Sequence, residues 1–250
     1  GAGSLWTNSA ELSVGFFGSS NSLTVAEGGK VSASRVEIGS SGTVNIGRFG
    51  TNDAAGTISA PTIAFGDGTG TINFNQSDAT TISAAISGAG TVNQLGSGTT
   101  TLSGSNSYTG ATSVAAGTLL VEGEISLSDV SVLNGAAIGG DGTLGGSLSL
   151  AAGAQFVFSL TGALTVNGGS VTFGDFGIDD LVGLDGSVAE SAYTLINGTA
   201  AINFSNVANL GVGNTYDIGG GKYAYFLADS PNLVVNVIPE PSTYALLALA

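Results

Sequence analysis

Residues 119–132 read LLVEGEISLSDVSV, and this stretch carries the pattern that decides the fold. It contains three apolar pairs spaced i, i+2, namely Leu119/Val121, Ile125/Leu127 and Val130/Val132. Side chains at this spacing lie on the same face of a β-strand. Gly, Ser, Asp and Glu separate the pairs, and residues of this kind favour tight corners. The stretch therefore predicts very short strands joined by turns.

The same pairs recur on both sides of this stretch, at Leu23/Val25, Val36/Ile38, Val44/Ile46, Ile63/Phe65, Ile72/Phe74, Leu148/Leu150, Phe156/Phe158, Leu164/Val166 and Val171/Phe173. A β-sandwich would show longer strands at a more regular spacing. Short strands with frequent Gly-rich corners instead favour stacked coils that bury a continuous apolar core, with Ser, Thr and Asn forming ladders between coils. We predict an all-β chain with a parallel β-helix (β-solenoid) over residues 1–175.

Composition argues against a mainly helical fold and against several functions. The chain has 42 Gly in 250 residues, and each Gly inside a helix costs about 1 kcal/mol relative to Ala. It has no Cys, His or Met, so disulfides, zinc–thiolate sites, Cys nucleophiles and Ser–His–Asp triads are excluded. Because an initiator Met is absent, we expect a processed or trimmed chain whose signal peptide is already gone.

The net charge of −14 excludes an ordinary nucleic-acid binder. The four basic residues, Lys30, Arg35, Arg48 and Lys222, are scattered, whereas phosphate binding needs clustered cations. An anionic membrane surface is disfavoured for the same reason. The acidity favours solubility in an extracellular medium. Ca²⁺ bound by paired carboxylates is the alternative, and no other cofactor is predicted.

Residues 176–237 differ from the first part of the chain. The segments 193–196, 201–204, 223–226 and 233–237 have the pattern of longer strands, and five of the six Tyr lie beyond residue 190. Because the end of a solenoid exposes strand edges that need covering, we predict a C-terminal β cap here. Residues 238–250 follow as a short apolar tail, whose final run is far shorter than the roughly 20 residues that span a bilayer.

Residues 87–119, SGAGTVNQLGSGTTTLSGSNSYTGATSVAAGTL, resemble the autotransporter-associated β-strand repeat. The resemblance rests on a G-x-G segment, then TLSGSNSYTGAT, then GTL. Residues 6–15 and 21–25 resemble passenger-type surface repeats less specifically. The resemblance implies a β-helix displayed outside the cell, and thus a secreted, extracellular or cell-surface location.

Residues 237–247, VIPEPSTYALL, resemble a PEP-CTERM sorting signal, with Pro239, Glu240 and Pro241 matching its motif. In that family the motif precedes a membrane helix and an Arg-rich end, and an exosortase handles the tail in bacteria that make exopolysaccharide. The resemblance implies exosortase-type machinery as a partner, and membrane contact only through the tail before processing. Here the helix is incomplete and no basic cluster follows.

An enzyme must also be considered, because several β-helix proteins are polysaccharide lyases or glycosidases. A glycosidase needs two carboxylates at a defined separation. The candidate pairs are Glu122/Glu124, Asp179/Asp180, and Asp141 with a neighbour on the next coil. A lyase also needs a cation or metal, and Arg35 and Arg48 are the only arginines. We predict no catalytic residues and keep a polysaccharide-active lyase or glycosidase as the alternative function.

Two further candidates concern ligands rather than catalysis. The run 139–144, GGDGTL, departs from the calcium nonapeptide because Leu144 stands where that repeat has Asp. Asp179 and Asp180 with Asp185 could hold Ca²⁺, although a solvated acidic loop is favoured. Aromatic side chains that could stack on sugars, with packing as the favoured interpretation, are Trp6, Phe16, Phe17, Tyr223 and Tyr225.

Taken together, these observations predict a non-enzymatic structural or adhesive protein of the bacterial surface or exopolysaccharide matrix, with exopolysaccharide as a possible partner. A pure spacer without a ligand stays open beside the adhesin.

Overall fold

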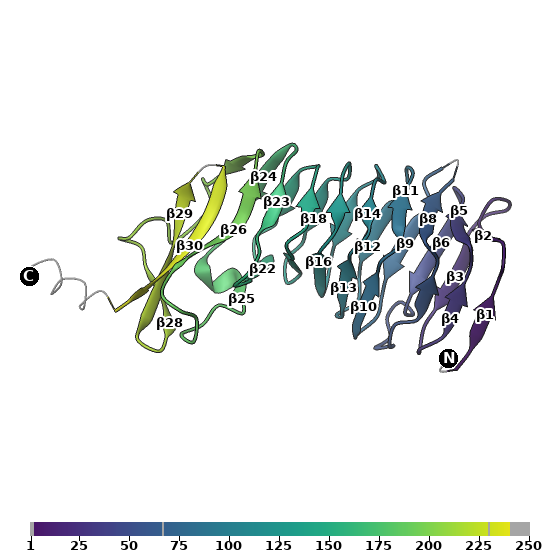
Figure 1. Cartoon of the computed structure of the whole chain (residues 1–250), viewed down its shortest axis with the longest axis horizontal. Coiled ribbons are helices and arrows are strands. Elements are labelled where there is room, and N and C mark those ends of the chain that lie inside the picture. The colour runs from purple at the N-terminus through teal and green to yellow at the C-terminus, as the bar shows by residue number, and fades with distance from the viewer. Residues whose placement is uncertain (1–2, 67, 230, 241–250) are drawn as a thin grey trace, which may run out of the picture.

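The structure is a computed structural model of the chain, and it describes residues 3–66, 68–229 and 231–240 (Figure 1). It is a rod in which short strands stack side by side along the long axis, from β1 near the N-terminus to a broader sheet at the other end. No α-helix occurs in the described part of the chain, and the one helical segment is the 3₁₀ turn η1 (Ile178–Asp180). The predicted all-β parallel β-solenoid is therefore confirmed.

Each coil contributes one strand to each of three faces, and neighbouring coils pair in parallel. The first face is interrupted once and consists of β1 (Leu5–Thr7), β4 (Lys30–Ser32) and β7 (Thr57–Ser59), then β10 (Ala79–Ile82), β13 (Thr99–Leu102), β16 (Thr118–Val121), β19 (Ala137–Gly139), β22 (Gln155–Val157) and β25 (Leu181–Val182). The second face is also interrupted once and consists of β2 (Glu11–Val14), β5 (Arg35–Ile38), β8 (Thr62–Phe65) and β11 (Ala85–Ser87), then β14 (Ser105–Asn106), β17 (Glu124–Ile125), β20 (Thr143–Leu144), β23 (Leu164–Val166) and β26 (Ala192–Gly198).

The third face is one continuous nine-stranded sheet of β3 (Asn21–Val25), β6 (Gly42–Ile46), β9 (Thr71–Phe74), β12 (Thr91–Gln94), β15 (Thr112–Val114), β18 (Val130–Val132), β21 (Leu148–Leu150), β24 (Ser170–Phe173) and β27 (Ala201–Asn203). The coil length varies, because Thr112 pairs with Val130 but Ser170 pairs with Ala201. Corner loops absorb this variation, which explains why the sequence shows a pattern without a strict period.

The apolar pairs fill the interior of the rod. In ten of the twelve predicted pairs both side chains are buried, as in Val36/Ile38 and Leu148/Leu150. Leu23 is only half-buried, because among the described strands β3 pairs only with β6. The prediction for Leu127 is wrong: the side chain is 59% exposed, because β17 ends at Ile125 and the chain bends at residue 127.

Polar ladders also connect the coils, as predicted. The amide of Asn73 donates to Asn45 on the preceding coil at 3.0 Å, and that of Asn93 donates to Asn73 at 2.9 Å. Thr71 and Thr91 lie one coil apart, with their hydroxyls 3.3 Å from each other. These bonds run along the rod, so they fix the register between coils as well as satisfying half-buried polar groups.

The C-terminal end of the rod is closed by an antiparallel sheet. β26 pairs in parallel with β23 on one side and antiparallel with β30 (Asn232–Pro239) on the other. β30 continues to β29 (Lys222–Asp229), and β29 to β28 (Tyr216–Gly219). Three buried rings, Phe173, Phe176 and Phe226, stack in series with centroids 4.9 and 5.6 Å apart, so they join the solenoid core to this sheet.

The predicted sorting motif begins where β30 ends. Pro239 pairs with Lys222 of β29, and Glu240 is exposed. Pro241 and the rest of the predicted tail, residues 242–250, lie outside the described residues. Within the described ranges no helix has the length and apolar character needed to cross a membrane.

Candidate functional site

The N-terminal flank of the rod combines charged and aromatic side chains. Arg35 on β5 lies opposite Glu11 on β2, and Glu37 follows two residues later on the same strand. The Arg35 guanidinium is 3.4 Å from a Glu37 carboxylate oxygen and 3.8 Å from one of Glu11. The guanidinium is shared by two carboxylates and half-exposed, so it does not form the free cationic centre that a lyase needs.

Next to this ion pair lies an open hollow of about 520 Å³, lined by Glu11, Ser13, Gly15, Phe16, Phe17 and Glu37. Phe17 is 91% exposed and Phe16 is partly exposed. Carboxylates accept hydrogen bonds from hydroxyl groups, and aromatic rings present a flat apolar face. The hollow therefore presents carboxylate hydrogen-bond acceptors beside two aromatic rings.

Trp6 lies at the same end of the rod and is exposed on β1. The C-terminal aromatic candidates, Tyr223 and Tyr225, do not form an exposed aromatic surface. Tyr225 is buried, and its hydroxyl accepts a 2.6 Å hydrogen bond from the Asn236 amide. Tyr223 is half-buried in β29. The packing interpretation therefore holds for Tyr225 and not for Phe17.

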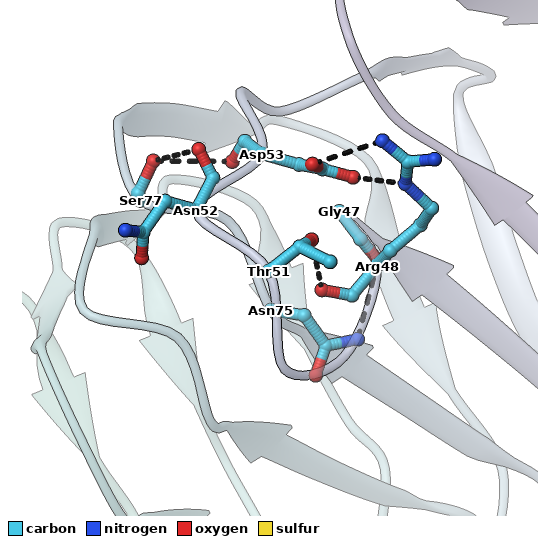
Figure 2. A network of polar contacts seen from close by, with 7 residues as sticks. All are labelled: Gly47, Arg48, Thr51, Asn52, Asp53, Asn75 and Ser77. Atoms are coloured by element: carbon cyan, nitrogen blue, oxygen red, sulfur yellow. Dashed lines mark hydrogen bonds and ion pairs between the residues drawn. The ribbon is translucent and has the colours of Figure 1, made fainter.

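Arg48 is bound within its own loop rather than free. Figure 2 shows its guanidinium forming two hydrogen bonds with the Asp53 carboxylate, one of them at 3.0 Å. The hydrogen bond from Arg48 lowers the pKa of Asp53 to about 2, although the carboxyl is only 8% exposed. The Thr51 hydroxyl donates to the Arg48 carbonyl at 2.9 Å.

The next coil fastens this loop, since the Ser77 hydroxyl contacts the Asn52 and Asp53 carbonyls at 2.9 and 3.2 Å (Figure 2). The cluster thus stabilises the long corner between β6 and β7, and sequence reasoning missed the pairing of Arg48 with Asp53.

Among the carboxylate candidates, Glu122 interacts with Asp141 on the next coil. Gly140 and Gly142 allow this, because a Cβ at either position would lie 2.1 or 2.2 Å from a backbone oxygen of the preceding coil. The corners therefore stack backbone on backbone and place one acid beside the other. Partial burial, followed by the hydrogen bond with Asp141, raises the pKa of Glu122.

Glu124 is exposed on β17, opposite Thr143 and Ser105. The two arginines lie on the second coil, several coils away from this corner. Within the described residues, the carboxylate pairs and the arginines thus do not come together in one groove.

The acids considered for Ca²⁺ mainly bind their own loops. The Asp180 carboxylate accepts the Gly177 amide at 2.8 Å, and its pKa is raised chiefly by burial. Asp185 accepts the Ser187 amide at 2.8 Å and the Ser187 hydroxyl, which lower its pKa. The described part of the chain has no group of three or more acidic side chains arranged to hold a metal ion.

The segment with the repeat motif has a buried polar network. The Tyr108 hydroxyl lies 2.6 Å from that of Thr112, which lies 2.8 Å from that of Ser128. Burial raises the pKa of Tyr108 to about 12. Asn106 accepts the Ile86 amide at 3.0 Å and donates to the Glu124 carbonyl at 2.9 Å, linking three coils. The buried polar residues of the motif, Asn106, Tyr108 and Thr112, therefore connect coils.

The chain is thus a three-faced parallel β-solenoid in which the buried residues of the repeat motif connect neighbouring coils. Residues 92–121 match the model of the Passenger-associated-transport-repeat, which confirms the repeat part of the resemblance. The chain is also similar to the "Adhesin BmaC autotransporter" of Brucella suis biovar 1 (strain 1330), at 45% identity over 102 residues. The match covers 40% of this chain and 3% of that protein. No solved structure matches the chain.

Proposed function

We propose that the chain is a non-enzymatic adhesive protein of the bacterial surface or exopolysaccharide matrix, in which a rigid rod presents a weak sugar-binding surface. The exposed Phe17 beside the hollow lined by Glu11 and Glu37 is the observation that carries this proposal. A contiguous exposed apolar patch often marks a contact site, and here Phe16 and Phe17 both line the same hollow. The similarity to a protein named an adhesin supports the same direction.

The test is retention of the full chain on columns of neutral and acidic polysaccharides, with and without Ca²⁺. We expect weak retention on neutral glycans and less on acidic ones, because the carboxylates of Glu11 and Glu37 repel uronic acids. Retention on neutral glycans should be lost in Phe17→Ser, which removes the exposed ring. Leu127→Ser is the matched control, since Leu127 is also exposed but lies elsewhere on the rod. Equal retention of both variants contradicts the assignment, and no retention of the unmodified chain leaves a spacer.

The alternative of a polysaccharide-active enzyme is tested in the same fractions. Its strongest support is the Glu122–Asp141 pair, because a glycosidase acid has a raised pKa. New reducing ends or unsaturated products that disappear in Glu122→Gln would replace the adhesive function with an enzymatic one. We expect no turnover with either protein.

We further propose that Pro239, Glu240 and Pro241 form a sorting motif read by exosortase-type machinery during secretion. The motif begins at Pro239, the last residue of β30, and Glu240 directly after it is exposed. Expression in a host with an exosortase, followed by fractionation of cells and medium, tests this. Replacing all three residues by Ala should leave more of the protein with the cells and less in the medium, and unchanged release would contradict the proposal.

A further inference from the structure

The first face of the solenoid is interrupted between β7 and β10, which belong to neighbouring coils inside the described rod. β7 pairs only with β4, and β10 pairs only with β13. Pro61, two residues after β7, has no amide hydrogen to donate to a neighbouring strand. Just before the two strands, the Asp78 side chain accepts the Ala55 amide at 2.7 Å, in place of a backbone carbonyl. The break therefore follows from the local sequence, and it leaves the facing edges of β7 and β10 unpaired among the described residues.

The interruption of the second face, between β11 and β14, is closed by hydrogen bonds. The Asn106 side chain accepts the Ile86 amide at 3.0 Å, and the Ser107 amide donates to the Ile86 carbonyl at 2.8 Å. No corresponding bond joins β7 to β10 within the described ranges. The first face thus has an opening that the second face lacks.

A hollow of about 500 Å³ lies at this opening, over β4, β7 and β10. Five hydroxyl groups line it, those of Ser32, Thr57, Ser59, Thr81 and Ser83. In the part of the chain that the structure describes, none of these five hydroxyls forms a hydrogen bond with another residue. Other outward hydroxyls are engaged, such as those of Thr71 and Thr91, which lie 3.3 Å apart. Because a hydroxyl both donates and accepts, the hollow presents unused hydrogen-bonding groups.

The rest of the lining is apolar and comes mainly from Ile58 and Pro61. Ile58 packs against the core but stays half-buried, whereas Val31, its partner on the preceding coil, is only 5% exposed. Among the described residues that line this hollow none is charged, in contrast to the hollow beside Phe17 with its two glutamates. The volume lies in the range of small-molecule sites, about 300–1,000 Å³. Uncharged hydroxyls beside aliphatic surface complement a neutral sugar, which carries hydroxyl groups and apolar C–H faces.

The contacts at both ends of the opening argue against an inserted peptide strand. Before the two strands, the Ser77 amide donates to the Asp53 carbonyl at 2.9 Å, and after them the Ala85 amide donates to the Pro61 carbonyl at 3.0 Å. Neighbouring strands lie about 4.8 Å apart, so a strand between β7 and β10 would need about twice that separation. The two coils cannot separate so far without breaking these bonds. The hollow therefore suits a sugar that enters from solvent.

We propose that the hollow between β7 and β10 is a binding site for neutral glycans, in which Ser59 and Thr81 bond to the hydroxyls of a sugar ring that covers Ile58. This inference rests on the proposed adhesive function and adds a second contact on another face of the rod. Phe17 lies in the corner between β2 and β3, which joins the second face to the third. Two weak sites on one rod hold it to a polysaccharide surface more strongly than either alone, so weak column retention needs both.

Methyl NMR of the full chain tests this site by itself, because Ile58 places a methyl group in the lining of the hollow. The ligands are soluble malto-, cello- and laminarin-type oligosaccharides. We expect at least one of them to shift the Ile58 methyl signal in a saturable manner, in the unmodified chain and equally in Phe17→Ser. Because the Phe17 variant keeps this response, failure of the hollow and failure of the surface at Phe17 are told apart.

Removal of two hydroxyls, Ser59→Ala with Thr81→Val, should raise the dissociation constant measured by this shift about tenfold or more, because each change deletes a hydrogen bond to the sugar. Thr101→Val is the matched control and should leave the constant unchanged, since Thr101 lies opposite Thr81 on β13 but outside the hollow. The proposal is overturned by no Ile58 shift with any of the three sugars, or by equal constants for the double variant and the control. A shift caused by an extended Thr/Val peptide instead of the sugars also overturns it.

Discussion

The two ends of the described rod differ in what covers their last strand edges and the end of the core. At the C-terminal end, β30, β29 and β28 extend the sheet, and Phe226 buries its ring against the last coils. At the N-terminal end of the described residues, β1, β2 and β3 each pair only with the following coil, and Trp6 and Phe17 are exposed. The comparison teaches that the antiparallel sheet buries the end of the core that it covers, through rings such as Phe226, whereas the first coils of the described chain hold their exposed rings by few contacts.

The largest expected effect concerns the ring stack at the C-terminal end. Phe226→Ala should destabilise the protein by about 3–5 kcal/mol, because it removes a fully buried ring and leaves a cavity. Phe17→Ala at the N-terminal end should change stability by less than about 0.5 kcal/mol, since that ring makes few contacts. Urea unfolding followed by circular dichroism measures both. Similar midpoints for the two variants would remove the distinction between the ends.

A smaller effect is expected in the middle of the rod. Tyr108→Phe removes one of the two buried hydroxyl partners of Thr112, while Ser128 remains, and should cost about 0.5–1.5 kcal/mol. Tyr108 also makes stability depend on pH. Its pKa is about 12 in the folded chain and 10.0 in an ordinary Tyr, so its contribution is complete below pH 10 and is lost as the pH rises to 12.

Unfolding midpoints measured between pH 9 and pH 12 should therefore fall more steeply for the unmodified chain than for Tyr108→Phe. Tyr216→Phe is the control, because that ring is exposed on β28 and its removal should leave the slope unchanged. Parallel slopes for Tyr108→Phe and the unmodified chain would show that the Tyr108 proton does not contribute.

At the N-terminal end, the Arg48–Asp53 pair should contribute an acid-side dependence. The pKa of Asp53 is lowered from 3.8 to about 2, so its stabilisation is complete above pH 3.8 and is lost as the pH falls toward 2. Asp53→Asn should therefore flatten the loss of thermal stability over that range. Glu124→Gln, an exposed control in mid-rod, should not. The expected difference is a few degrees at most, because the Arg48 side chain is largely exposed.

The fold could be predicted from the sequence because the apolar pairs, such as Val36/Ile38, report directly which face of each strand is buried. The positions of the corners were harder to predict, since Leu127 follows the same i, i+2 spacing but lies after β17 has ended. Contacts between coils depend on the coil length, which the sequence does not show. The pairing of Glu122 with Asp141 requires knowing that one coil places residue 141 over residue 122. The ladder from Asn45 to Asn93, in contrast, follows from polar residues at similar positions in successive strands.

The smallest expected effect concerns the corner of Glu122 and Asp141 in the middle of the rod. It tests whether this corner stabilises the folded chain, as the ring stack at the C-terminal end does. Because the pKa of Glu122 is raised in the folded chain, its ionised form opposes folding, and this cost appears as the pH rises through that pKa. Glu122→Gln should therefore raise the melting temperature slightly at pH 7 and leave it unchanged near pH 3, where both states are protonated. Glu124→Gln is again the control. A lower melting temperature at pH 7 would mean that the stacked acids stabilise the corner, as the ring stack stabilises the C-terminal end.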